Sequence, residues 1–147
     1  MQQHIEILAV ATPGRAMLDV SRRVGERLRA AGAEDGLVTL FVRHTSASLL
    51  IQENADPDVR HDLLTALDRL APEDAGYVHT LEGPDDMPAH IKSALTATSL
   101  AIPVMGGRMM LGTWQGIYLV EHRARPHARE IVLHFAGSLS ASTEAGA

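Results

Sequence analysis

Two histidines and the acidic loop between them form the segment best suited to hold a metal ion. His79 and His90 are eleven residues apart, and residues 82–86 read Glu-Gly-Pro-Asp-Asp. A turn at the glycine and proline can bring the two imidazoles together. Two histidines with a carboxylate suit zinc, manganese or iron, whereas carboxylates alone suit magnesium. The alternative interpretation is a polar loop with two unrelated surface histidines.

A second candidate begins at His44. This histidine follows residues 37–43, an apolar and β-branched stretch, and precedes the small hydroxyl residues Thr45, Ser46 and Ser48. Small residues at the end of a strand leave room for a ligand, and hydroxyls can hydrogen-bond to it. The structural alternative is a buried histidine beside a turn stabilised by serine and threonine hydroxyls.

The third candidate pairs Asn54 with Asp56, directly before Pro57. Aspartate followed by proline is typical of a helix N-terminus, so Asp56 already has a structural role as the cap. Asn54 has no such role. Together the two side chains can bind a cation through their oxygens, or stand beside an anion held by the helix N-terminus. The alternative is that Asp56 is only a cap.

The fourth candidate surrounds the single tryptophan. Trp114 and Gln115 lie between Gly112 and Gly116, and glycines weaken a strand unless a backbone or ligand approaches closely. Strand alternation puts Gln115 and Glu121 on the same face as apolar residues. Buried polar groups need partners, so these two are either functional or paired. The alternative is an edge strand with one solvated face.

The elements that must position these residues follow from local patterns. Residues 4–11 alternate as a strand, a helix is predicted from Thr12 to Gly32, and residues 37–43 predict a strand covered on both faces. Further helices are predicted from Asp56 and from Met87, the latter with Ile91, Ala94, Leu95 and Thr98 inward, and His79 is placed at the end of a short strand. Gly106-Gly107 predicts a hairpin, and residues 113–122 and 129–136 predict two more strands.

This order predicts an α+β fold with mixed, mostly antiparallel sheet layers and three helices. We expect one domain over residues 1–137 and a flexible polar tail over residues 138–147. The other histidines are predicted to be solvated or structural: His4, His61, His122, His127 and His134.

Composition excludes several classes of protein. The 147 residues carry 13 basic and 18 acidic side chains, a net charge of −5, which argues against a general nucleic-acid binder. The absence of cysteine excludes a thiolate zinc site, a cysteine nucleophile and a disulfide scaffold. We find no apolar run long enough for a membrane span and no pattern of a signal peptide, so a cytoplasmic location is expected.

The four candidate segments together resemble one known family. Residues 44–48, 53–57, 82–92 and 112–117, in this order, are similar to motifs of the YjbQ-type family, also called the secondary thiamine-phosphate synthase enzyme family. The similarity extends over roughly residues 2–137. It implies a YjbQ-like fold, a homotrimer, and a pocket lined by the motif histidines that holds a divalent metal ion.

The resemblance also implies a weak thiamine-phosphate synthase activity. That reaction joins hydroxymethylpyrimidine diphosphate to thiazole phosphate and releases pyrophosphate, and a metal ion would neutralise the leaving diphosphate. The metal, which is zinc, manganese or magnesium, is assigned to His44, His79 and His90. Acid–base or supporting work is assigned to Asp56, Asp85 and Glu121. The substrate is assigned to Thr45, Ser46, Ser48, Asn54, Trp114 and Gln115.

Two alternatives stay open on the same residues. One is a metal-dependent hydrolase of a small phosphorylated metabolite, because a metal with an open position also activates water. The other is a non-catalytic metabolite-binding trimer, in which polar groups on apolar strands pair across subunits. The expected partner is a small phosphorylated substrate, and neither nucleic acid nor a membrane is expected. A diphosphate site usually uses several lysines or arginines, and the motifs supply only Arg43 and Lys92.

Overall fold

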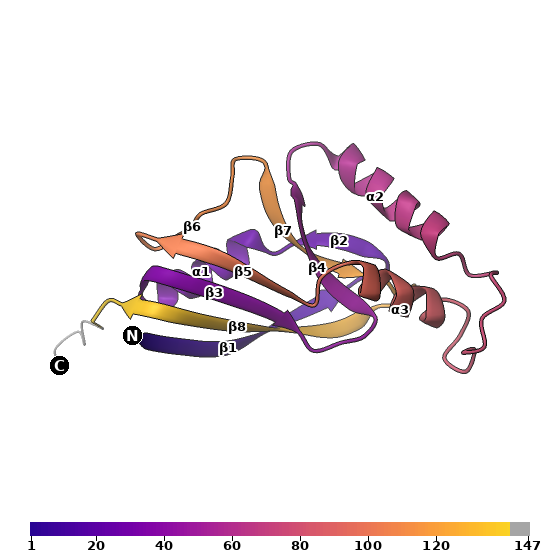
Figure 1. The fold of residues 1–147 in the computed structure, drawn as a ribbon, viewed down its shortest axis with the longest axis horizontal. Helices are drawn as coiled ribbons and strands as arrows, with labels where there is room; N and C mark the ends of the chain where they lie inside the picture. The colour runs from indigo at the N-terminus through magenta and orange to yellow at the C-terminus, as the bar shows by residue number, and fades with distance from the viewer. Residues whose placement is uncertain (142–147) are drawn as a thin grey trace.

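The computed structural model describes residues 1–141 as two antiparallel sheets and three helices (Figure 1). In chain order the elements are β1 (Gln2–Thr12), β2 (Ala16–Asp19), α1 (Ser21–Ala30), β3 (Ala33–Val42), β4 (Ala47–Glu53), α2 (Pro57–Leu70), α3 (Asp86–Leu95), β5 (Ser99–Met105), β6 (Arg108–Met109), β7 (Gln115–Glu121) and β8 (His127–Leu139). The larger sheet has the strand order β1-β8-β3-β5-β6 and the smaller one β2-β7-β4. The predicted α+β class with three helices is confirmed.

The core lies between the two sheets. Side chains alternate along β7, so Ile117 and Leu119 pack against the larger sheet while Tyr118 and Val120 face the other way, toward α2. Burying side chains of this size contributes roughly 1.5–3 kcal/mol each. The alternation predicted for this strand therefore decides which of its residues reach the core.

Helix α2 begins as the sequence predicts, but it is only lightly attached. The Asp56 carboxylate accepts a hydrogen bond of 2.9 Å from the Asp58 backbone N–H, and Pro57 occupies the first helical position. Leu63 and Leu64 rest on the outer face of the smaller sheet, yet no residue of α2 is fully buried. Figure 1 shows α2 lying across one end of the molecule, next to α3. Within residues 1–141, no helix has the length and apolarity needed to cross a membrane.

The helix predicted to start at Thr12 is wrong at its N-terminal end. Residues 16–19 form β2, where Met17 lies opposite Val120 of β7, and α1 begins only at Ser21. The strand is favoured because pairing with β7 buries Met17 in the second apolar cluster. Thr12 caps no helix, and its hydroxyl instead donates to the carboxylate of Glu121 at 2.6 Å.

Two further expectations around α3 are wrong. The helix buries Ala89 and Lys92, whereas Ala94 and Leu95, predicted to face inward, are exposed. The short strand expected before His79 is absent, and residues 71–85 form an irregular connection between α2 and α3. The prediction counted apolar side chains and so missed that Asp86 and Lys92 are among the residues that α3 buries.

The hairpin between β5 and β6 is confirmed. Gly106 and Gly107 both have positive φ, 60° and 78°, as a two-residue turn of this kind requires. The predicted tail starts too early, because Ser138 and Leu139 belong to β8. Residues 142–147 of that tail lie outside the described residues.

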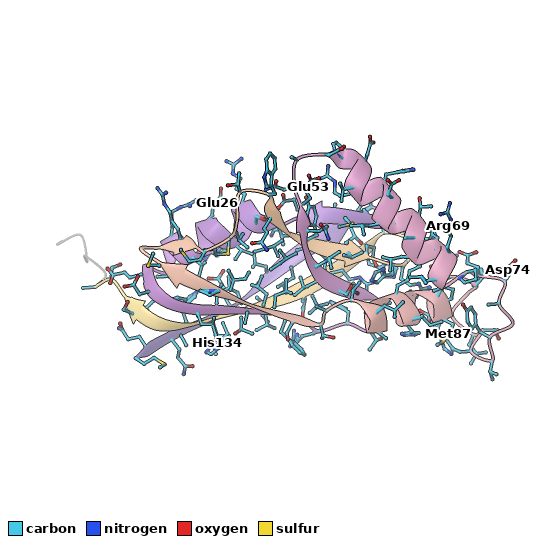
Figure 2. All side chains as sticks on the ribbon, turned by 45° about the horizontal axis from the view of Figure 1, so that its top comes forward. Glu26, Glu53, Arg69, Asp74, Met87 and His134 are labelled. Carbon is cyan, nitrogen blue, oxygen red and sulfur yellow. The ribbon has the colours of Figure 1, made fainter. Side chains whose placement is uncertain are left out.

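The outer face of the larger sheet is apolar and exposed. Leu37 and Phe41 of β3 are 43% and 45% exposed, and Ile5 and Ile7 on β1 are exposed beside β8. Phe41 and Ile7 lie on either side of Val132. His134, in the same row of β8, is labelled at this side of the molecule in Figure 2. In the single chain, β3 is therefore covered on one face only, contrary to the prediction.

Candidate metal centre

His79, Asp86 and His90 meet at the N-terminus of α3. The Oδ2 oxygen of Asp86 lies 2.7 Å from Nε2 of His79 and 3.0 Å from Nε2 of His90. Among residues 1–141 this is the one group of at least three histidine and carboxylate side chains with ligand atoms all within 4.8 Å of each other. The predicted approach of the two imidazoles is thus present in the structure.

Two elements supply the three side chains. Asp86 opens α3, and His90 follows one turn later on the same side of the helix, the spacing at which side chains meet. His79 comes from the irregular connection, which turns back at Gly83, where φ is 100°. The Asp86 backbone N–H then faces the Gly83 carbonyl. Figure 1 shows this connection looping out beyond α2 and α3.

Arg123 holds the carboxylate of Asp86 in place. Its guanidinium donates to Oδ1 of Asp86 at 2.8 Å and to Oδ2 of Asp85 at 2.9 Å, and it also reaches the Glu82 carbonyl. Asp86 is only 6% exposed. Burial acts to raise its pKa, but the hydrogen bond from His79 and the charges of His90 and Arg123 outweigh burial, so the pKa of Asp86 is lowered. Asp86 is therefore an ionised carboxylate with Oδ2 directed at both imidazoles.

The orientation of His90 is fixed by a backbone carbonyl. Nδ1 of His90 lies 2.9 Å from the carbonyl oxygen of Thr45. Because that oxygen can only accept, Nδ1 carries a hydrogen, and a neutral His90 directs the lone pair of Nε2 toward Oδ2 of Asp86. Two acceptors at 3.0 Å need a positive charge between them. Either a second proton on His90 or a metal ion supplies it.

The residues present fit a divalent cation. Zinc–ligand distances of about 2.0–2.2 Å put tetrahedral ligand atoms about 3.3 Å apart, so the contacts of 2.7 and 3.0 Å need to open by only a few tenths of an ångström. A carbonyl or carboxylate partner on the second ring nitrogen is typical of histidine ligands. Two imidazoles and one carboxylate also leave coordination positions for water or a ligand.

A cavity of about 470 Å³ lies beside His90. The end of β3 and the following residues contribute Phe41, Arg43, His44 and Thr45, and α3 contributes Ser93. Its volume is within the range of small-molecule sites. The candidate metal centre and a space for a ligand therefore share His90.

His44 is not part of the cluster. Its Nε2 accepts a hydrogen bond of 2.8 Å from the Glu130 backbone N–H, and its Nδ1 faces the guanidinium of Arg129. Burial, followed by the charge of Arg129, lowers the pKa of His44. The predicted metal set of three histidines is corrected on this point: His79 and His90 converge with Asp86, while His44 lines the adjoining cavity.

Glu121, Ser46 and Ser48 take part in buried pairing. Glu121 is fully buried and receives two hydrogen bonds from Arg129, at 2.8 and 2.5 Å, in addition to the one from Thr12. Arg129 also donates to the Ser46 hydroxyl at 3.0 Å. Ser48 is bonded to His122 at 2.8 Å. These predicted catalytic and substrate residues line neither the cluster nor the 470 Å³ cavity.

The tryptophan segment and Asn54 form a separate exposed site. Asn54 faces the carbonyls of Thr113 and Gln115, and the Gln115 side chain accepts from the Gly112 N–H. Trp114 is exposed, and Asp56 caps α2. None of these residues joins the metal cluster or the cavity, so in a single chain the structure does not bring them to the predicted site.

Asp86 and Arg123, which holds its carboxylate, were not singled out from the sequence. Asp86 stands four residues before His90, a helical ligand spacing that was available as a signal. Arg123 lies 37 residues from Asp86, and nothing local indicated the pairing. His122, predicted to be solvated or structural and grouped with the charged Arg123 and Arg125, is almost wholly buried, and burial lowers its pKa to about 4.

Known proteins place the chain in a family. The family profile described as UPF0047 protein YjbQ-like matches residues 6–138. The chain belongs to the YjbQ (UPF0047) family. It is 53% identical over 139 residues to UPF0047 protein sll1880 of Synechocystis, covering 94% of this chain and 95% of that one. It is 50% identical over 102 residues to UPF0047 protein YjbQ of Escherichia coli O157:H7, covering 69% and 74%.

The YjbQ fold is shared with solved structures. An uncharacterised YjbQ/UPF0047 protein from Clostridium acetobutylicum superimposes with a TM-score of 0.82 at 35% identity, over 89% of this chain and 99% of that one. The predicted family and fold are therefore confirmed.

The predicted thiamine-phosphate synthase function is corrected by the same comparisons. The relatives are named only as UPF0047 proteins, and the solved structure is named as uncharacterised, so no such activity is indicated. The positions of the predicted substrate residues also argue against this function. Of the predicted substrate residues, Thr45 alone borders the cavity beside the cluster.

Proposed function

We propose that His79, Asp86 and His90 bind one divalent cation, zinc or manganese, and that this cation binds a small phosphorylated ligand in the 470 Å³ cavity. The observation that carries the proposal is the approach of two Nε2 atoms to a single oxygen of Asp86 while Nδ1 of His90 is occupied by Thr45. Two imidazole ligands favour these metals over magnesium, which prefers oxygen.

The ligand class follows from charge and space. A divalent cation held by one carboxylate keeps a net positive charge, and its open positions suit the oxygens of a phosphate group. The cavity begins at His90 and includes the guanidinium of Arg43, which is shared with Glu130. When bound, the cation would supply Lewis acidity at those oxygens. The chain's own residues would orient the ligand, and the Thr45 hydroxyl would donate a hydrogen bond to it.

Removal of either imidazole is expected to abolish tight metal binding. The His79→Ala and His90→Ala variants should each bind zinc and manganese at least about a hundredfold more weakly, since even residues that only support a metal ligand contribute 10–100-fold. Isothermal titration calorimetry with each metal alone measures this. His61→Ala, which removes an exposed histidine of α2, should match the unsubstituted protein. Equal affinities for all three variants would refute the proposed site.

The phosphorylated ligand is tested with manganese as a probe. Glycerol 3-phosphate should show strong ³¹P line broadening when protein that was incubated with manganese and then freed of unbound metal is added. His90→Ala treated in the same way should cause much less broadening, and His61→Ala should match the unsubstituted protein. Glycerol without phosphate should not compete. Binding of metal without any broadening of the phosphate signal would leave the metal site standing and remove the ligand class.

We further propose that copies of this chain pack on the outer face of the larger sheet, as a homotrimer. The row of exposed apolar side chains there includes Ile7, Leu37 and Phe41. Exposed apolar patches of this kind are typical of protein interfaces. The sequence pattern of β3 calls for cover on both faces, and a second copy would supply the cover that the single chain lacks. Phe41 also borders the cavity, so a neighbouring copy would stand close to the ligand.

Charge on this face is expected to dissociate the assembly. Phe41→Asp should convert trimer to monomer at micromolar protein concentration, because an unpaired carboxylate at an apolar interface must be desolvated. Sedimentation velocity measures the species. Leu70→Asp, which places the same charge on an exposed apolar residue of α2, is the matched control and should remain trimeric. A monomeric unsubstituted protein, or a trimeric Phe41→Asp variant, would contradict the proposal.

A further inference from the structure

A second cavity, of about 220 Å³, lies beneath α2. The side chains that decide its chemistry are Arg15, Asp68, Lys92 and His122, and Leu64 and Leu67 supply apolar surface. It is enclosed by α2, α3, β7 and the turn before β2. None of the three residues of the candidate metal centre lines it.

The charges in this cavity do not balance. The Lys92 side chain is 4% exposed, and its ammonium lies 2.5 Å from Oδ1 of Asp68. Arg15 donates to the same oxygen at 3.0 Å. Glu121 also borders the cavity, but Arg129 neutralises it through two hydrogen bonds. Two cations therefore share one carboxylate, so the cavity has one positive charge in excess, carried by Arg15, whose side chain is 41% exposed.

His122 provides a second observation that points to a ligand. It is 2% exposed, and its Nε2 is bonded to the Ser48 hydroxyl at 2.8 Å. Its Nδ1 has no hydrogen-bond partner within residues 1–141. Every fully enclosed side-chain nitrogen or oxygen among these residues has a partner, so Nδ1 is not fully enclosed. An accessible imidazole nitrogen without a protein partner, in a residue that lines the cavity, is a free hydrogen-bonding position.

We infer that this cavity binds a small organic monoanion, with its carboxylate on Lys92 and Arg15 and a neighbouring hydroxyl on Nδ1 of His122. One negative charge restores balance, and the short apolar part of the ligand contacts Leu64 and Leu67. The volume is below the usual range for drug-sized ligands, which limits the ligand to a few carbon atoms. The inference is independent of the proposed metal centre.

Helix α2 gives access to this site. None of its 14 residues is fully buried, and Asp68 is about half exposed at the mouth of the cavity. The Asp68 carboxylate thus occupies the place beside Lys92 that the carboxylate of a ligand would take, and it competes with the ligand. Movement of this one side chain would admit a ligand without unfolding α2.

Substitution of Asp68 gives a test with a distinctive sign. Lactate, which has a carboxylate beside a hydroxyl, should bind the full chain saturably, and propionate, which lacks the hydroxyl, should bind more weakly. Asp68→Asn should tighten lactate binding about tenfold, because it removes the competing charge while keeping the shape. Lys92→Met should abolish binding, and Arg15→Gln should weaken it. Calorimetry gives the affinities, and ¹⁵N shifts of the His122 ring report contact with the ligand.

Controls separate this site from the metal centre and from general charge effects. Arg22→Gln, which removes an exposed arginine of α1, and His90→Ala should both leave lactate binding unchanged. If Lys92→Met does not fold, Asp68→Asn should still tighten lactate binding and Arg15→Gln should still weaken it. Absence of saturable binding by lactate and propionate, tighter binding of inorganic phosphate than of lactate, or weaker lactate binding by Asp68→Asn would each overturn the inference.

Discussion

Replacement of Arg129 by methionine is expected to destabilise the protein by about 3–5 kcal/mol, the cost of leaving a buried charge unpaired. Arg129 is the cation that neutralises Glu121, which is fully buried between the sheets. The same guanidinium also bonds to the Ser46 hydroxyl. Urea unfolding at neutral pH measures the loss. Arg43→Met is the matched control: its pair with Glu130 is half exposed, so it should cost no more than about 1 kcal/mol.

The pH dependence of the Arg129→Met variant should have the opposite sign from that of the unsubstituted protein. Burial raises the pKa of Glu121, but the hydrogen bonds from Arg129 and Thr12 outweigh it and lower the pKa in the folded state. A lowered carboxyl pKa stabilises the fold at neutral pH, and that contribution is lost as the pH falls through the folded-state value.

Without Arg129, burial prevails and Glu121 takes up a proton on folding. The free energy of unfolding of Arg129→Met should therefore rise as the pH is lowered from neutral toward the ordinary carboxyl range. Adding Glu121→Gln to Arg129→Met should recover much of the loss and remove this slope, since a neutral pair lacks the uncompensated charge. A single variant that is no less stable than Arg43→Met would show that the buried pair is not needed.

Replacement of Asp86 by asparagine is expected to weaken zinc binding by at least about a hundredfold. Asparagine keeps the shape of the side chain but removes the negative charge that both imidazoles face, and support from neighbouring residues alone contributes 10–100-fold. The Arg123 guanidinium would then face a neutral amide in place of Oδ1 of Asp86. Competition with a chromophoric chelator measures the dissociation constant.

Asp85 is the matched control for Asp86. It precedes Asp86 directly, and its pKa is lowered to about 2: burial opposes the shift, and the hydrogen bonds from Arg123 and the Ala124 N–H outweigh it. It makes no contact with the two histidines, so Asp85→Asn should cost at most about tenfold in affinity, through Arg123 alone. Equal losses for Asp85→Asn and Asp86→Asn would mean that Asp86 acts through the shape of the loop and is not a ligand.

Local chemistry explains what could be predicted from the sequence. The Asp56–Pro57 helix start and the Gly106-Gly107 hairpin depend on residues within one turn, so they were predicted correctly. The alternation along β7 was also predicted, because a strand has a fixed period of two. The helix predicted from Thr12 failed, since the choice between β2 and a helix depends on pairing with β7, about a hundred residues away.

The candidate site likewise has residues that could be predicted from local sequence and residues that could not. His79 and His90 could be paired from the sequence because one acidic loop, residues 82–86, joins them. His44 was grouped with them on the resemblance, yet its ring bonds to the Glu130 N–H on β8. Arg123 could not be found, since it lies just after β7 and only the tertiary fold brings it to Asp86.

By itself the sequence determined the family, the α+β class, and a histidine–carboxylate segment able to hold a cation, because these follow from residue types at short spacing. Only the tertiary structure decided which carboxylate faces the imidazoles. It also decided that the Glu121 carboxylate pairs with Arg129. It also placed Lys92, Arg15 and Asp68 around one cavity beneath α2. The physical reason is that a buried charge takes its partner from whichever strand or helix packs against it, and that choice is made by the whole fold.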